Sequence, residues 1–178
     1  LDATRDFQTD MEYDALNRAK KITYPLDVAG KRKELTPSYN RAGNLEKINL
    51  AGTDYVQHIA YNAKGQRLLI AYGNNIMTRY VYEPQTFRLM RLRSEKYQQN
   101  NWTFQPQSGS TKQDYGYEYD LVGNIIRIKD RTPNSGVNST NELIRNFAYD
   151  PLYRLIQATG RECDTPPPNP IWDDTPRC

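Results

Sequence analysis

The sequence predicts an all-β chain made of consecutive β-hairpins, and one stretch shows the repeating unit most clearly. Residues 115–119 carry a tyrosine at every second position, which places three rings on one face of a strand. Residues 120–123, Asp-Leu-Val-Gly, suit a tight turn, because Asp can accept backbone hydrogen bonds and Gly tolerates a positive φ. Residues 125–129 then alternate apolar and basic side chains, which indicates a second strand.

The same unit occurs six times along the chain. The copies begin at Tyr13, Tyr39, Tyr61, Tyr82, Tyr119 and Tyr149. The residue that closes each turn, called the pivot below, is in the same order Asn17, Gly43, Gly65, Phe87, Gly123 and Tyr153. An apolar residue stands five positions after each pivot, namely Ile22, Ile48, Ile70, Leu92, Ile128 and Ala158. This fixed register predicts a repeat protein whose core positions are locked to its turns.

The pattern Tyr-Asp/Asn-x-x-Gly-Asn/Arg-Leu/Ile resembles the YD repeat of Rhs proteins, which also occurs in insecticidal toxin complexes and in teneurins. The resemblance covers residues 12–162. The runs YNAKGQRLLIAYGN, YVYEPQTFRLMRLRSEKY, YEYDLVGNIIRIKD and FAYDPLYRLIQATGRE are most similar to the repeat region of toxin-complex B components. In that family, YD repeats build a hollow β-shell around a toxic C-terminal polypeptide. The resemblance therefore implies a curved sheet that is one section of such a shell.

Taken in order, the chain is predicted to have one YD-repeat region, residues 1–162, and a proline-rich tail, residues 163–178. After the first repeat, residues 27–33 are expected to form a polar loop around a glycine. The next two repeats, in residues 34–72, are the most regular.

Repeat four has a longer turn without glycine, in which Pro84 presets the backbone and Phe87 closes the turn. The toxin-complex resemblance includes this variant. Two polar segments interrupt the later repeats and are expected to be loops or disordered insertions, one near residues 94–114 and one near 130–141.

The composition argues against a solitary globule with a thick core. Only 37% of the residues are hydrophobic, against about 45–50% in typical domains. Tyrosine, with 14 copies, carries much of the apolar surface, and its hydroxyl can reach a polar partner at the same time. Such side chains suit a thin sheet.

Charge and hydropathy exclude two classes of partner. The net charge of +3 is too small and too dispersed for nucleic-acid binding, and no apolar run is long enough to span a membrane. The chain shows no signal peptide and begins without methionine. We interpret it as part of a longer protein that is secreted or extracellular.

No catalytic, cofactor-binding or metal-binding residue is predicted. The only histidine, His58, lies inside a predicted strand, and no nucleophile motif accompanies it. The carboxylates Asp14, Asp120 and Asp150 all follow a repeat tyrosine, which favours turn capping over acid–base chemistry. The aspartate autoprotease motif that often follows Rhs repeats is absent after Asp150.

The two cysteines, Cys163 and Cys178, are too few for a zinc site. They could be joined by a disulfide across the tail, although free thiols fit the sequence equally well.

The sequence thus predicts a structural, non-enzymatic segment of an Rhs or toxin-complex protein. Its expected partners are the remaining repeats of the parent shell, the enclosed toxin polypeptide and other toxin-complex subunits. The alternative is a cell-surface adhesion or carbohydrate-binding module, because tyrosine planes can stack on the rings of surface glycans. A glycan array would separate these two functions.

Overall fold

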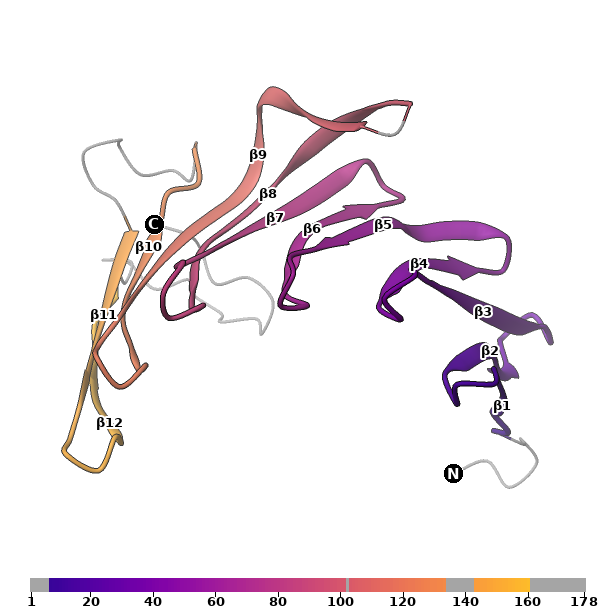
Figure 1. The fold of residues 1–178 in the computed structure, drawn as a ribbon, viewed down its shortest axis with the longest axis horizontal. Helices are drawn as coiled ribbons and strands as arrows, with labels where there is room; N and C mark the ends of the chain where they lie inside the picture. Colours follow the sequence, from indigo (N-terminus) through magenta and orange to yellow (C-terminus); the bar gives the residue numbers. More distant parts are fainter. Residues whose placement is uncertain (1–6, 102, 134–142, 161–178) are drawn as a thin grey trace, which may run out of the picture. The chain divides into compact units, whose positions relative to one another are not determined.

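The computed structural model describes residues 7–101, 103–133 and 143–160 of the chain, and it shows twelve strands and no helix in these residues (Figure 1). The strands are β1 (Asp10–Tyr13), β2 (Ala19–Leu26), β3 (Arg32–Tyr39), β4 (Leu45–Leu50), β5 (Thr53–Tyr61), β6 (Arg67–Tyr72), β7 (Ile76–Tyr82), β8 (Leu89–Asn100), β9 (Thr103–Tyr119), β10 (Ile125–Asp130), β11 (Leu143–Tyr149) and β12 (Leu155–Ala158). The predicted all-β class is confirmed.

The strands form one antiparallel meander, in which each strand pairs with the next one along the chain from β1 to β12. The repeat turns join β1 to β2, β3 to β4, β5 to β6, β7 to β8, β9 to β10 and β11 to β12 (Figure 1). Short turns connect antiparallel neighbours without a crossover, so a hairpin repeat produces this order directly.

Contacts divide the chain into two compact units. The first comprises Leu1–Thr78 and Tyr97–Gln105, and the second comprises Arg79–Lys96 and Pro106–Cys178.

The first unit contains the most deeply buried apolar side chains. Ala71, Met77 and Tyr97 form a cluster against which Leu69 and Phe104 pack. The Phe104 ring meets the edge of Tyr97, with 5.3 Å between ring centroids. The Tyr97 hydroxyl donates to the Tyr72 carbonyl at 2.8 Å, and burial raises the pKa of this phenol. The core is therefore thin, with tyrosine bridging apolar packing and backbone hydrogen bonding.

The apolar positions that follow the pivots all lie in strands, but they are not equally buried. Ile70 is buried and pairs with the buried Ile59 across β5 and β6. By contrast, Ala158 is exposed in β12, the last strand of the sheet. The predicted core role therefore applies in the centre of the sheet and not at its final strand.

Residues 94–114 were expected to be a loop or a disordered insertion, and this expectation is wrong. Strands β8 and β9 run through the segment and carry side-chain hydrogen bonds between them. The Ser110 hydroxyl accepts from the Lys96 backbone N–H at 3.0 Å, and Arg93 donates to the Thr111 hydroxyl at 2.8 Å. A strand whose face is exposed to solvent needs no apolar side chains on that face. The low hydrophobicity of residues 94–114 is therefore compatible with strands.

The other predicted insertion and the tail are described only in part. Strand β10 ends at Asp130 and β11 begins at Leu143, so residues 131–133 lie between strands, while residues 134–142 are outside the described residues. Cys163, Cys178 and their proposed disulfide also fall outside the described residues.

Candidate functional site

The repeat turns are the feature that the sequence singles out, and their pivots share one backbone conformation. All six pivots have a positive φ: Asn17 59°, Gly43 84°, Gly65 77°, Phe87 59°, Gly123 110° and Tyr153 61°. Such values cost a non-glycine residue roughly 1–2 kcal/mol. Asn17, Phe87 and Tyr153 therefore need compensating contacts from the surrounding turn.

The acidic or amide residue after each repeat tyrosine provides these contacts. The Asp120 carboxylate accepts from the backbone N–H groups of Gly123 and Asn124 at 2.7 and 2.8 Å. Asp14 accepts from Leu16 and Arg18 in the same way, both at 2.9 Å. Asn40, Asn62 and Asp150 make equivalent bonds in their own turns. The side chain thus closes the turn from inside, which explains why Asp or Asn recurs there.

Repeat four keeps this arrangement with a longer side chain. Its loop has one extra residue, and Glu83 takes the capping position. The Glu83 carboxylate accepts from the backbone N–H of Gln85 at 3.0 Å and from that of Thr86. The glutamate side chain is one methylene longer than that of aspartate, and this extra length compensates for the wider loop.

A seventh turn of this kind occurs where only a polar loop was expected. The Asp27 carboxylate accepts from the N–H groups of Ala29 and Lys31 at 2.9 and 3.0 Å, and Gly30 has a φ of 71°. The spacing Asp27-x-x-Gly30 was visible in the sequence. It was overlooked because leucine, rather than tyrosine, precedes the aspartate.

Four repeat tyrosines connect successive repeats. Each hydroxyl donates to a main-chain carbonyl of the preceding repeat, always at the second residue after that repeat's pivot. The pairs are Tyr39 to Ala19 at 2.9 Å, Tyr61 to Leu45 at 2.7 Å, Tyr119 to Leu89 at 2.8 Å, and Tyr149 to Ile125 at 2.9 Å. The tyrosine therefore does more than cover one face of its strand: it fixes the distance between neighbouring turns.

Replacing Tyr61 by phenylalanine is expected to lower the free energy of unfolding by about 1 kcal/mol, because the Leu45 carbonyl loses its phenolic donor. Tyr55→Phe is the matched control, since its side chain is 57% exposed. Urea denaturation followed by circular dichroism would measure both. Equal losses for the two variants would contradict the role given to the inter-repeat bond.

The turn hydrogen bonds also shift the pKa values of the capping carboxyls. Hydrogen bonds from the Arg18 side chain and backbone lower the pKa of Asp14 below its ordinary value of 3.8. A backbone bond from Thr86 lowers the pKa of Glu83 below 4.5. Partial burial acts to raise the pKa of Asp120, but bonds from Asn124 and Gly123 outweigh it, and the net change is downward.

These directions predict loss of stability in acid. A carboxyl whose pKa is lower in the folded state stabilises the fold fully above its ordinary value, and the contribution is lost as the pH falls through the folded value. Unfolding midpoints should therefore be steady from about pH 7 to 5 and fall below about pH 4. The Asp120→Asn variant should lose less stability over that acid range, because the amide keeps the turn but does not titrate. An identical acid profile for the variant would argue against this origin.

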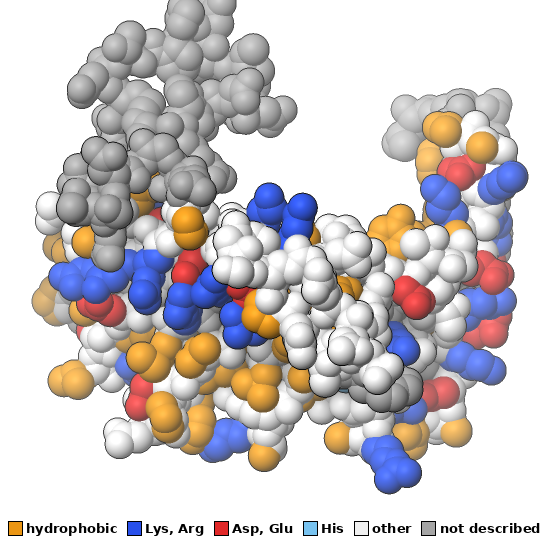
Figure 2. Space-filling view, turned by 90° about the horizontal axis from the view of Figure 1, so that it is seen from above, with side chains coloured by type: hydrophobic (Ala, Val, Ile, Leu, Met, Phe, Trp, Pro, Cys, Tyr) orange, Lys and Arg blue, Asp and Glu red, His pale blue; other side chains and the backbone are white. Residues whose placement is uncertain are grey.

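Two buried carboxylates lie in the second unit, away from the turns. Glu95 is only 1% exposed and pairs with Arg79 and, at 3.0 Å, with Arg93. Asp114 is 5% exposed and accepts from Arg91 at 2.7 Å, an interaction that raises the pKa of that guanidinium. Figure 2 shows basic and acidic side chains close together on one face of the chain. Each of these buried carboxylates is thus paired with an arginine of a neighbouring strand.

Gly123 is the pivot whose replacement is most constrained by a neighbouring repeat. A Cβ at this position would lie 3.1 Å from a terminal nitrogen of Arg88. Gly123→Val should cost roughly 2 kcal/mol, since a β-branched residue is strained at a φ of 110°. In strand β9, Gly116→Val is the control, because its nearest neighbours would be 3.9 Å away. Similar melting shifts for both would count against the turn assignment.

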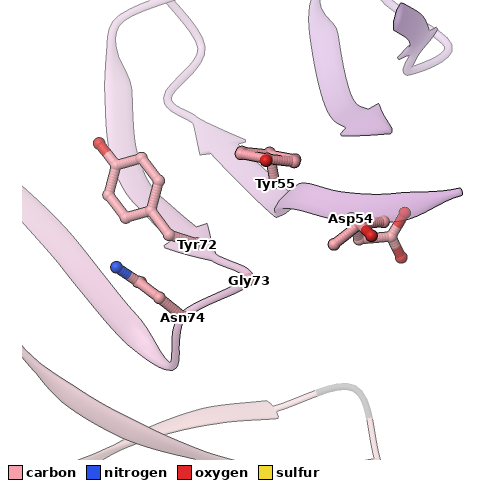
Figure 3. A pocket seen from close by; sticks show the side chains of 6 residues that line it. Asp54, Tyr55, Tyr72, Gly73 and Asn74 are labelled. Atoms are coloured by element: carbon pink, nitrogen blue, oxygen red, sulfur yellow. The ribbon is translucent and has the colours of Figure 1, made fainter. Parts of the chain in front are cut away.

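Each unit has a pocket among its described residues. The first, of about 360 Å³, is lined by Thr53, Asp54, Tyr55, Tyr72, Gly73 and Asn74. Figure 3 shows the Tyr72 ring and the Asn74 amide together at this pocket, with Tyr55 on strand β5. The second, of about 470 Å³, lies between the turns of repeats four and five and includes Arg88 and Tyr119.

Neither pocket contains the sequence's only histidine. His58 stacks on Phe104 with 5.6 Å between ring centroids and lies 3.6 Å from a Glu46 oxygen. Within the described part of the chain, no group of three or more His, Cys, Asp or Glu side chains is arranged to hold a metal ion. The described residues also include no helix long and apolar enough to cross a membrane.

Together, the meander and its turns define a repeat protein in which capped hairpins are added one after another and linked by tyrosine. Comparison with known proteins agrees with this class. The chain is 32% identical over 158 residues to the toxin subunit YenC1 of Yersinia entomophaga, and 28% identical over 152 residues to YenC2 of the same organism. These matches cover 87% and 84% of the chain but only 15% and 14% of the two subunits.

Solved structures show the same similarity in three dimensions. The crystal structure of TcdB2-TccC3-Cdc42 matches with a TM-score of 0.72 and 30% identity, over 90% of this chain and 7% of the other. The Photorhabdus luminescens Tc holotoxin pore matches with a TM-score of 0.69 and 30% identity, over 88% and 7%. No family model matches the chain. The chain is homologous to subunits of toxin complexes, which is consistent with the Rhs-repeat toxin-complex family and agrees with the resemblance drawn from its repeats.

Proposed function

We propose that this segment is part of a β-shell wall that encloses a toxic polypeptide and performs no catalysis itself. The inter-repeat tyrosine bond carries the proposal. Because the hairpins of repeats two, three, five and six are each hydrogen-bonded to the preceding repeat at the same position, the sheet can be extended without a thick core. A wall needs this property, since it must enclose volume with few residues. The ion pairs of Glu95 with Arg93 and of Asp114 with Arg91 further support a structural role.

The proposed partners follow from this role. They are the remaining repeats of the parent protein, the enclosed polypeptide and other toxin-complex subunits, in a secreted assembly. Similar solved structures include that of TcdB2-TccC3-Cdc42 and that of the Photorhabdus luminescens Tc holotoxin pore. Exclusion of solvent by a paired sheet would protect an unfolded polypeptide from proteases and from aggregation.

Photo-crosslinking in the full-length parent protein would test this function. A photoreactive phenylalanine analogue would replace either Ile144 or Arg145, which are successive residues of β11 with exposed side chains on opposite faces. We expect one of the two positions to crosslink to the enclosed polypeptide and the other not to do so. Crosslinking from neither position, or equal crosslinking from both, would refute enclosure by this part of the chain.

A second candidate function, carbohydrate binding, is supported by the pocket in the first unit. Tyr55 and Tyr72 offer aromatic surface, while Asn74 and Asp54 offer polar groups at the same place. Binding on a glycan array that disappears with Tyr72→Ala would favour this module over a shell wall. An array without binding would leave the wall as the function that fits the chain.

A further inference from the structure

One face of the sheet in the second unit carries more basic than acidic side chains. Five basic side chains there share three carboxylates in ion pairs, namely Arg79 and Arg93 with Glu95, Arg91 with Asp114, and Arg127 and Lys129 with Glu118. Side chains that pair across neighbouring strands, or that stand at alternate positions of one strand, point to the same side of a sheet. We call these residues, together with Arg131, the charged face.

Arg131 adds a positive charge that is paired with no carboxylate of the described residues. Its backbone N–H donates to the Asp114 carbonyl at 2.7 Å, which places this exposed residue beside β9. A Cβ at Gly116 of β9 would lie 3.9 Å from Cδ of Arg131 and 3.9 Å from Cβ of Lys129. The glycine therefore leaves a gap in the charged face, and two cations border this gap.

Two of the carboxylates each hold two cations, so their pairing leaves positive charge uncompensated. Glu95 is buried between Arg79 and Arg93, whose side chains remain partly exposed. The Nε atoms of both arginines have no hydrogen-bond partner in the described part of the chain. Since a guanidinium has five N–H donors, each arginine keeps donors for a further carboxylate on its outer side. The two cations of β10 around Glu118 repeat this arrangement.

The opposite face of the same strands uses its polar groups internally. Ile128 of β10 pairs there with Tyr117 of β9 and with Arg145 of β11. Burial raises the pKa of the Tyr117 phenol. Tyr119, which points to the same side as Tyr117, donates its hydroxyl to the Leu89 carbonyl at 2.8 Å. The tyrosines thus pack on their own sheet, whereas the charged face keeps unused donors and charge.

We infer that the charged face is the side of this segment that meets the enclosed polypeptide, and that it binds an extended, acidic stretch of that polypeptide. On β8, Arg91 lies four residues before Glu95, and on β9 its partner Asp114 lies four residues before the next carboxylate of the face. Each step is about 13 Å in a strand, so the surface suits roughly eight extended residues with carboxylates on one side. This inference rests on the proposed function, because it names the side on which the polypeptide lies.

The spacing of the charges distinguishes this partner from a continuous polyanion. The three carboxylates lie among the cations and would repel a chain that places a phosphate at every position. A polypeptide can set neutral side chains against these carboxylates and acidic ones against the guanidiniums. The planar guanidinium binds a carboxylate with two parallel hydrogen bonds, which favours such a match.

A binding titration with the full 178-residue chain would test the inference. The probe is a fluorescein-labelled peptide of about ten residues in which glutamate and serine alternate, and its anisotropy is recorded at low salt. Arg131→Glu should weaken binding about fivefold or more, because it reverses an exposed charge on the charged face. Arg145→Glu is the matched control: it makes the same change in net charge on the opposite face, and should alter the affinity by less than about twofold.

Three results of this titration would overturn the inference. They are the absence of binding at millimolar chain, equal weakening by the two variants, and tighter binding of a single-stranded DNA oligonucleotide that carries the same charge as the peptide. Circular dichroism of each variant would show that its fold is retained.

Photo-crosslinking in the parent protein separates this inference from the proposed function. Ile144 pairs with Lys129 and therefore lies on the charged face, so the enclosed polypeptide should crosslink to a photoreactive residue at this position. Crosslinking from position 145 alone would keep enclosure by the wall and would reject the charged face as its inner side.

Discussion

Gly73→Ala is expected to be among the most damaging single substitutions in the chain, with a loss of about 3 kcal/mol in the free energy of unfolding. An ideal Cβ at Gly73 would lie 1.9 Å from the carbonyl oxygen of Asp54 and 3.0 Å from its carbonyl carbon. Both are backbone atoms of strand β5, so no side-chain rotation can relieve the overlap. The Gly73 N–H also donates to the Tyr55 carbonyl at 3.0 Å, and this bond would be lost if the strands separated.

The damage should extend to the apolar cluster of the first unit. Ala71 and Met77, both fully buried, lie on the strands that the Gly73 turn connects. Gly116→Ala is the control, because a Cβ there would meet only atoms 3.9 Å away. Urea denaturation followed by circular dichroism should show a large shift in midpoint for Gly73→Ala and a small one for Gly116→Ala. A shift below about 1 kcal/mol for Gly73→Ala would mean that β5 does not approach the turn so closely.

Glu95→Gln is expected to cost about 3 kcal/mol, because it leaves the charges of Arg79 and Arg93 without their buried partner. The amide has nearly the same volume as the carboxylate, so packing is preserved and the loss reports on charge. The two arginine side chains are 42% and 32% exposed, and their partial hydration keeps the cost at the lower end for a broken buried pair.

An exposed glutamate provides the comparison. The side chain of Glu34 is 54% exposed and pairs with Lys21 at 3.3 Å, so Glu34→Gln should cost less than about 1 kcal/mol. Thermal melts of both variants, in low and in high salt, would separate the effects. Salt should reduce the small Glu34 effect and leave most of the Glu95 effect. Equal losses for the two variants would show that Glu95 is hydrated in solution.

The turns could be predicted from the sequence because their chemistry is local. A carboxylate such as that of Asp120 reaches N–H groups three and four residues away, so the turn type is written in a short segment. The fold class follows from these turns, since capped hairpins with alternating strands have no regular alternative to an antiparallel sheet. The turn at Asp27 obeys the same rule and was overlooked only because no tyrosine precedes it.

The strands in residues 94–114 could not be recognised in this way. Their polar side chains are typical of loops, and pairing between β8 and β9 depends on neighbours such as Ser110 and Lys96, which are 14 residues apart. Likewise, Glu95 pairs with Arg79 across 16 residues, and Asp114 with Arg91 across 23. A single sequence carries no periodic signal for such pairs.

By itself, then, the sequence determined the hairpin repeat, the positions of six of the seven turns and the family resemblance, because each depends on residues within one turn. Only the tertiary structure decided which apolar positions are buried, which carboxylates are paired, and which groups connect successive hairpins. Those outcomes depend on the strand that lies alongside, and the identity of that strand is fixed by the whole meander. Arg18 illustrates the difference: its bond to Asp14 lies within one turn, whereas its contact with the Tyr39 ring, 4.3 Å from the guanidinium carbon, depends on the next repeat.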